Sequence, residues 1–222
     1  MEHRIAFYTV YVRDQAGDRE AEYSILWLKA YGAAAVGVSG PRSSEWFKPY
    51  SNPKKFEGAL PVLWRDDDDV IYQVSPGPHS LAHVIGPEQE VRRAPAHGLD
   101  VAPLRPFVAA LEDPALPAAQ FEWRNQHEAR IETQMQPQQI LSVQVSYAPG
   151  WRAAANGTPV RVRRDALGLT IVEPRCSGPC RITLSYDGGA EHRWSRIAQG
   201  GGILLCVLWP LALGGKRTRQ RE

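Results

Sequence analysis

The chain has 222 residues, 43% of them hydrophobic, so it can bury a core and does not have the composition of a disordered protein. Basic residues number 26 and acidic residues 24, but the last seven residues, KRTRQRE, hold four of the bases and one acid. The rest is nearly neutral, which excludes the broad basic surface that binds nucleic acid. Three cysteines exclude a dense disulfide scaffold and a four-cysteine zinc site, but allow one bridge.

Residues 1–92 predict a small α/β unit. Apolar residues alternate in its first segment, as in a strand, and then recur at helical spacing around Trp27. The next apolar run and three later ones are short and bounded by turn residues, which indicates strands. The expected order is strand, helix and four further strands, at residues 5–12, 20–31, 33–39, 60–65, 70–74 and 81–85.

A loop over residues 39–58 carries four aromatic residues, Trp46, Phe47, Tyr50 and Phe56. Loops of this length are often functional, and aromatic faces stack on sugars or lie in the interfacial zone of a membrane. The same rings could instead close a small core beneath the loop. Both interpretations are open from the sequence.

Two groups of polar residues resemble metal ligands only in part. Four consecutive aspartates at 66–69 lack the alternating ligand positions and the glycine turn of a calcium loop, so a solvated hairpin turn is the better interpretation. His79 and His83 are four residues apart, but the prolines at 76 and 78 oppose the helix that would align them for zinc. We therefore expect no metal site and no cofactor.

Residues 93–119 are rich in proline and alanine, which predicts a linker with a short helix around residues 104–111. Residues 120–190 predict an antiparallel β-domain, a β-sandwich or half-barrel, because alternating segments recur with turn signals between them. The pair Asn156-Gly157 is the clearest turn, since Asn-Gly accepts the two positive φ values of a type I′ hairpin. The strands are expected at residues 121–135, 138–147, 159–165, 167–173 and 180–186.

Residues 197–215 run for nineteen positions without a charge and predict a transmembrane helix. As a helix they would span roughly 28 Å, about the thickness of a bilayer core. A buried C-terminal helix is the alternative, but it would show polar positions on one face. The basic tail, residues 216–222, should be cytoplasmic and the body therefore outside. No export signal is visible in the first fifteen residues, so the chain is either the end of a longer multi-span protein or a tail-anchored protein with a cytoplasmic body.

Cys176 and Cys180 flank a Gly-Pro turn between two predicted strands, and this spacing can bring two sulfurs into bonding reach. An oxidising exterior would preserve the bond. The alternative is two free thiols in a cytosolic turn. Cys206, within the apolar segment, should stay single.

A resemblance follows from the stretch YAPGWRAAANGTPVRVRRDALGLTIVEP, the strand CRITLSYDGG after it and the apolar segment that comes next. Together they are similar to the C-terminal end of bacterial YfhO-like polytopic membrane proteins, which are related to the type C, dolichol-phosphate-mannose type glycosyltransferases. The earlier stretch LWLKAYGAAAVGV is similar to an element of that family in which a helix ending in Tyr-Gly feeds a strand. The residues that carry the main phrase are Tyr147, Pro149, Gly150, Trp151, Arg152, Asn156, Gly157 and Tyr186.

The resemblance implies an extracytoplasmic accessory module with the final span of a glycosyltransferase-like envelope protein of the bacterial inner membrane. Its partners would be the lipid bilayer, a lipid-linked sugar or glycan, and upstream membrane helices of the same protein. The chain lacks the family's first extracytoplasmic loop with its acidic catalytic residue, so no catalytic residue is carried over, and Trp151 is expected to pack under the sheet.

Taken together, the sequence predicts an α+β protein, with a small α/β unit, a sandwich-like antiparallel β-domain and one C-terminal transmembrane helix. We expect no catalysis from this chain alone, although the parent protein could be a lipid-linked-sugar transferase. The alternative is a tail-anchored cytosolic interaction protein with no link to sugars. A self-contained hydrolase is disfavoured, because no Gly-x-Ser-x-Gly motif, phosphate-binding glycine loop or paired carboxylates are present.

Overall fold

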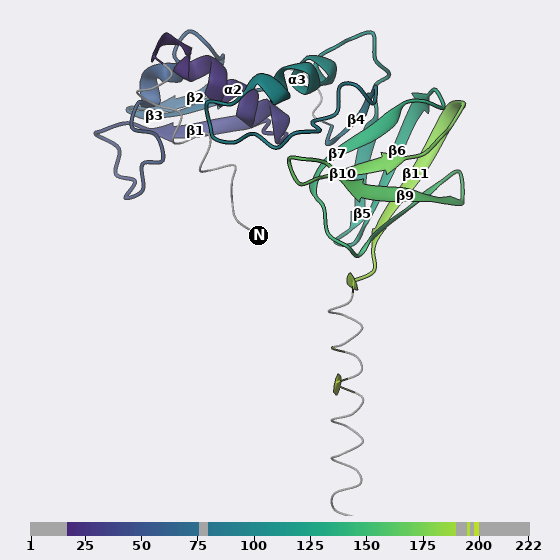
Figure 1. The fold of residues 1–222 in the computed structure, drawn as a ribbon. Helices are drawn as coiled ribbons and strands as arrows, with labels where there is room; N and C mark the ends of the chain where they lie inside the picture. Colours follow the sequence, from purple (N-terminus) through teal and green to yellow (C-terminus); the bar gives the residue numbers. More distant parts are fainter. Residues whose placement is uncertain (1–16, 76–79, 190–194, 196–197, 200–222) are drawn as a thin grey trace, which may run out of the picture.

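The structure is a computed structural model that describes residues 17–75, 80–189, 195 and 198–199. Antiparallel sheets dominate the described part, with a few helices packed against them, which confirms an α+β fold (Figure 1). Apart from Ala198 and Gln199, the predicted membrane segment 197–215 lies outside the described residues, and so does the predicted strand 5–12. No helix among the described residues combines the length and the apolar character needed to cross a bilayer.

The N-terminal unit pairs a helix with a three-stranded sheet of order β1-β3-β2. A core of apolar side chains, centred on Phe56 and Tyr72, lies between the sheet and α2, with Leu28 as the helix's buried contribution. The predicted helix 20–31 and the predicted strands 33–39, 60–65 and 70–74 are confirmed, and Asp67 and Asp68 form the predicted turn between β2 and β3. The elements are η1 (Gly17–Arg19), α2 (Glu20–Ala30), β1 (Ala35–Ser39), η2 (Pro53–Phe56), β2 (Val62–Asp66) and β3 (Asp69–Gln73).

Gly32 ends α2 in a Schellman motif, because the N–H of Gly32 donates to Lys29 O (3.0 Å) and that of Ala33 donates to Leu28 O (2.9 Å). Its φ of 74° favours glycine, and a Cβ there would come within 2.7 Å of Gln144 Oε1. Gln144 lies on strand β7 of the second sheet, and its Nε2 donates to the carbonyls of Lys29 (2.8 Å) and Ala30. The C-terminus of α2 is therefore capped by a side chain of the larger sheet.

The larger sheet has eight strands in the order β4-β7-β10-β9-β8-β11-β6-β5, and all its pairings are antiparallel. It curls until its edges approach, where His83 of β4 bridges Ala118 just before β5 (Figure 1). Both halves of this near-barrel point apolar side chains such as Leu141 and Ile182 into one interior core. The strands are β4 (Ala82–Ile85), β5 (Gln120–Asn125), β6 (Glu128–Met135), β7 (Ile140–Ser146), β8 (Trp151–Ala155), β9 (Thr158–Arg164), β10 (Leu169–Glu173) and β11 (Gly178–Tyr186).

A third core joins the two sheets. Helix α3 (Arg105–Leu111), preceded by η3 (Ala102–Leu104), packs with α2 over the outer face of β4, β7 and β10, and the fully buried Trp27, Leu104 and Ile171 lie in this core. The indole Nε1 of Trp27 donates to Gly98 O at 2.8 Å. This core is the reason that the two sheets form one body.

The observed organisation differs from the predicted one in several places. The predicted strand 121–135 is two strands, β5 and β6, and β8 was not among the predicted strands. Strand β4 pairs with β7 in the large sheet and does not belong to the N-terminal sheet. Residues 93–119 contain the predicted helix, but they are more than a linker, because Val101, Leu104, Phe107 and Val108 are buried in the core beneath α2. This burial could not be predicted from the sequence, because the prolines of the segment interrupt any regular spacing of its apolar residues.

Candidate functional site

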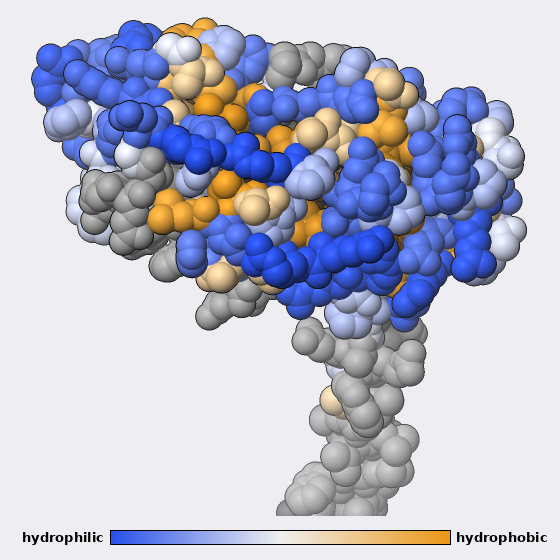
Figure 2. All heavy atoms as spheres, turned by 45° about the horizontal axis from the view of Figure 1, so that its top comes forward, coloured by the Kyte–Doolittle hydropathy of each residue, from blue (hydrophilic) through white to orange (hydrophobic). Residues whose placement is uncertain are grey.

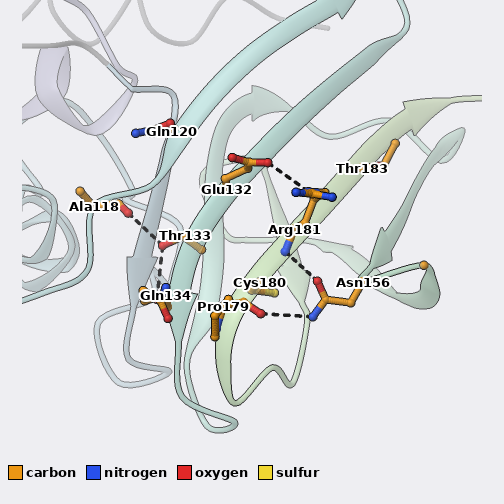
Figure 3. A pocket seen from close by; sticks show the side chains of 11 residues that line it. Ala118, Gln120, Glu132, Thr133, Gln134, Asn156, Pro179, Cys180, Arg181 and Thr183 are labelled. Carbon is orange, nitrogen blue, oxygen red and sulfur yellow. Dashed lines mark hydrogen bonds and ion pairs between the residues drawn. The ribbon is translucent and has the colours of Figure 1, made fainter.

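The outer face of the barrel has a hollow of about 710 Å³ at the end formed by the β8–β9 turn (Figure 3). Strands β6 and β11 form its floor, the start of β5 borders one side, and the Asn156-Gly157 turn borders the other. We call this hollow the outer groove. Its polar side chains are those of Gln120, Glu132, Thr133, Gln134, Asn156, Arg181 and Thr183.

The charges in the outer groove are compensated within it. Glu132 and Arg181 are direct neighbours across β6 and β11, and Arg181 Nε donates to Glu132 Oε1 at 3.0 Å. Arg130, two residues away on β6, donates to the same carboxylate oxygen. These two guanidinium groups, Arg130 first, hold the pKa of Glu132 below its usual range. The carboxylate is therefore ionised at neutral pH and already paired, so it does not act as a proton donor or acceptor there.

The turn bordering the outer groove is pinned to the floor. Asn156 and Gly157 have φ of 48° and 83°, which confirms the predicted hairpin turn between β8 and β9. Asn156 also accepts from the Arg181 N–H through Oδ1 (2.9 Å) and donates to Pro179 O through Nδ2 (3.2 Å). The side chain that permits the turn thus also fixes its position against β11.

The disulfide predicted from the sequence lies beneath this end of the groove. The structure joins Cys176 to Cys180, and both residues are buried in the interior core of the barrel. Cys180 lies on β11, and it also lines the outer groove. The bond therefore closes the turn between β10 and β11 directly under the outer groove.

The uncharged groups of the outer groove are available to a ligand. Within the part of the chain that the structure describes, the amides of Gln120 and Gln134 and the hydroxyl of Thr183 have no hydrogen-bond partner, and Gln120, Gln134 and Thr183 are exposed. Thr133 is different, because its hydroxyl donates to Ala118 O at 3.0 Å. A site of this kind offers amide and hydroxyl groups beside a carboxylate, Glu132, that is already paired.

The polar residues on the floor of the outer groove were not predicted from the sequence. The alternation of polar and apolar residues predicted only a strand over residues 121–135. The alternation correctly places Glu132 on an outer face, but nothing local says that the turn at Asn156 folds over that face. That proximity arises from long-range pairing of β11 with β6 and β8.

The aromatic loop divides into two parts. Tyr50 and Phe56 belong to the N-terminal core, with ring centroids 5.3 Å apart, and Phe56 is fully buried. Trp46 and Phe47 are exposed by 95% and 68%. The alternative of a small core therefore describes Tyr50 and Phe56, whereas only Trp46 and Phe47 remain accessible to a glycan or a membrane.

Of the residues that carry the resemblance, Asn156 and Gly157 border the outer groove, and the others meet at the opposite end of the barrel. Trp151 and Tyr186 are paired across β8 and β11, their ring centroids are 5.3 Å apart, and Trp151 packs in the interior core. Tyr147 and Pro149 lie in the loop that leads into β8, and the Tyr147 N–H donates to Gly168 O at 2.9 Å. Gly150 is buried. A side chain does not fit there, because a Cβ would lie 2.6 Å from the Tyr186 ring and 2.7 Å from the Gly189 nitrogen.

The aspartate turn and the histidines do not assemble a metal site among the described residues, where no group of three potential ligands gathers. Arg42 binds the carboxylates of Asp67 and Asp68, each at 2.8 Å, and Ser43 Oγ donates to Asp69. His83 contacts Gln144 Oε1 at 3.1 Å. His79 lies outside the described residues.

Figure 2 shows the barrel, on the right of the view, with a mostly hydrophilic surface. Comparison with protein-family models, with curated proteins and with solved structures finds no match to this chain.

Proposed function

We propose that the chain is an extracytoplasmic accessory module of a glycosyltransferase-like envelope protein, anchored by residues 197–215, whose outer groove binds an uncharged glycan. The resemblance to YfhO-like proteins and the apolar C-terminal segment motivate the membrane and transferase parts of this proposal. The single observation that carries the binding part is the outer groove itself, with its paired charges and its unpartnered amides.

The chemistry of the groove selects for a polyhydroxylated ligand. Each sugar hydroxyl donates one hydrogen bond and accepts others, and an amide side chain offers both complementary groups. An anionic ligand would compete with Glu132 for Arg181 and would place its charge beside the Glu132 carboxylate. A cationic ligand would compete with Arg130 and Arg181 for Glu132. A neutral saccharide breaks none of these contacts.

The groove also lies toward the end of the barrel opposite the one at which the chain leaves. Strand β11 runs from the groove at Pro179 to Tyr186, seven residues later, which is roughly 23 Å at the rise of a strand. In the proposed arrangement, with the anchor after Tyr186, the groove would meet a glycan that extends from the bilayer or an acceptor glycan of the envelope.

Binding of neutral tetrasaccharides to the full chain in a non-ionic detergent tests the proposal. Maltotetraose, chitotetraose and mannotetraose would be measured by calorimetry, beside tetragalacturonate as an anionic comparison. We expect a neutral member of the set to bind, and the double change Gln120→Ala and Gln134→Ala to weaken its binding about thirtyfold, since each of the two lost hydrogen bonds costs about 1 kcal/mol. The matched control is Gln138→Ala, an exposed amide outside the groove.

Two results would contradict the binding proposal: no neutral tetrasaccharide binds, or the double variant binds as tightly as the Gln138→Ala control. Location is tested separately by a cysteine at the exposed Ser51 in a chain with Cys206→Ser. Labelling by a membrane-impermeant maleimide in intact spheroplasts supports an extracytoplasmic body. Labelling only after lysis supports the tail-anchored cytosolic alternative.

A further inference from the structure

A cluster of aromatic rings closes the end of the barrel at which β11 finishes. Trp151 lies between Tyr186, at 5.3 Å, and Trp123, at 6.3 Å between ring centroids. The Trp151 ring is largely buried and its Nε1 donates to Ser146 O at 3.1 Å, whereas Trp123 is 43% exposed. We call Trp123, Trp151 and Tyr186 the end cluster. In this cluster the half-exposed indole of Trp123 packs against Trp151, which in turn packs against Tyr186.

The chain that leaves β11 is fixed against this end. The Tyr186 N–H donates to His127 O at 2.8 Å, and the Asp187 N–H donates to Gly150 O at 2.9 Å. The Gly189 N–H in turn donates to Asp187 Oδ1 at 2.8 Å. The described chain therefore stays beside the end cluster as far as Gly189.

The distance from this fixed point to the predicted membrane segment is short. Only residues 190–196 separate Gly189 from the segment 197–215. Even fully extended, the eight steps from residue 189 to residue 197 cover at most roughly 27 Å, and less in any other conformation. The barrel itself is about as long, because the nine residues of β11 span roughly 30 Å. A chain so anchored keeps the end cluster, which lies next to the connection, within about one barrel length of the membrane segment.

We propose that the end cluster docks on the interfacial layer of the lipid bilayer, with Trp123 as the residue that enters the headgroup region. This inference rests on the proposed membrane anchor. Trp and Tyr favour that layer because their rings combine an apolar body with a polar edge. Burying the exposed part of an indole there replaces contact with water by contact with lipid, and the packed rings below limit the entropy lost on docking.

Two ion pairs flank the end cluster in the part of the chain that the structure describes, and they bear on the kind of lipid surface. Arg124 pairs with Glu122 at 3.2 Å and Arg152 pairs with Asp187 at 3.1 Å. Because each of these arginines is already paired with a carboxylate, an anionic membrane would attract them little more strongly than a zwitterionic one. Docking should therefore occur on zwitterionic phosphatidylcholine and vary little with salt.

Tryptophan quenching in the full chain, reconstituted in phosphatidylcholine vesicles, tests the docking. The emission of one indole is the difference between the unchanged chain and a variant with phenylalanine at that position. Trp123→Phe is compared with Trp64→Phe, whose indole on β2 of the N-terminal sheet has a similar exposure of 50%. Lipids brominated near the headgroup should quench most of the Trp123 emission and leave the Trp64 emission unquenched. Soluble acrylamide should show the reverse preference.

The outcomes separate this inference from the proposed function. If the chain associates with vesicles but Trp123 is quenched no more than Trp64, the docking is refuted and the anchor stands. If the chain does not associate with vesicles at all, the anchor and the docking are both refuted. Near-ultraviolet circular dichroism of both phenylalanine variants verifies that the ring packing is retained.

Discussion

The buried carboxylate of Asp165 should make the stability of the barrel fall as the pH rises. Asp165 lies in the turn between β9 and β10 and is only 7% exposed. Its Oδ1 accepts the N–H groups of Leu167 (2.9 Å) and Leu169 (2.7 Å), which favour the ionised form. Burial outweighs these bonds and, with the nearby charge of Glu90, raises the pKa of Asp165 from 3.8 to about 6.

The sign and size of the effect follow from linkage between protonation and folding. Below pH 3.8 Asp165 is protonated in the folded and the unfolded chain, so it imposes no penalty. Between pH 3.8 and about 6 the unfolded chain ionises while the folded chain stays neutral, and stability is lost as the pH rises. The pKa difference of about 2 corresponds to about 3 kcal/mol, all of it lost above pH 6.

Urea unfolding of the full chain in non-ionic detergent, followed by tryptophan fluorescence from pH 4 to pH 8, measures this dependence. Asp165→Asn cannot ionise, but its side-chain oxygen can still accept the two N–H groups. We therefore expect this variant to lack about 2 kcal/mol of the decline between pH 4 and pH 7, because part of the total is already lost at pH 4. The control Asp113→Asn, at an exposed turn where Oδ1 accepts the Ala115 N–H, should keep the full decline. Identical pH profiles for the Asp165→Asn variant and the unchanged chain would refute the argument.

Three further predictions concern packing. Gly150→Ala should lower the free energy of unfolding by about 1–3 kcal/mol, because its Cβ would overlap a ring and a backbone nitrogen, and urea unfolding that detects no loss would contradict the contact. Cys176→Ala with Cys180→Ala opens a loop closed over four positions and should cost about 2 kcal/mol by the loop-entropy relation; the same loss in the reduced unchanged chain is the check. Phe56→Ala should cost about 3–5 kcal/mol, whereas Trp46→Ala should change stability by less than about 0.5 kcal/mol, and equal losses in thermal unfolding would be inconsistent with their burial.

Local patterns were sufficient where an element depends on its own residues. Helix α2 follows from apolar residues at helical spacing, and the β8–β9 turn follows from Asn156-Gly157, because only those residue types accept its φ values without cost. The turn at residues 66–69 was likewise predictable, since consecutive aspartates favour a solvated turn. In each case the signal lies within a few residues of the feature.

Prediction failed where an element depends on residues far away in the sequence. The segment WRAAA of β8 has weak strand propensity, and it becomes a strand because β11 and β9 pair with it on both sides. Strand β4 gave the correct local pattern, but its partner β7 lies more than fifty residues later. The outer groove depends on the same long-range pairings, so its residue types were visible in the sequence and their proximity was not.

The family phrase has a physical explanation that does not depend on the resemblance. Gly150 gives the departing chain room to pass, Trp151 fills the end of the core, and Tyr186 is its partner on β11. Arg152 then pairs with Asp187, the first residue after β11. All of these contacts hold one short stretch of chain at a fixed position relative to the barrel. A protein gains from such fixation when the chain beyond it is itself held in place, because a rigid exit determines how the barrel is oriented on whatever holds that chain. Association of the chain with vesicles tests whether a membrane holds the chain beyond Gly189, and the quenching of Trp123 by lipid tests whether the end cluster docks on that membrane.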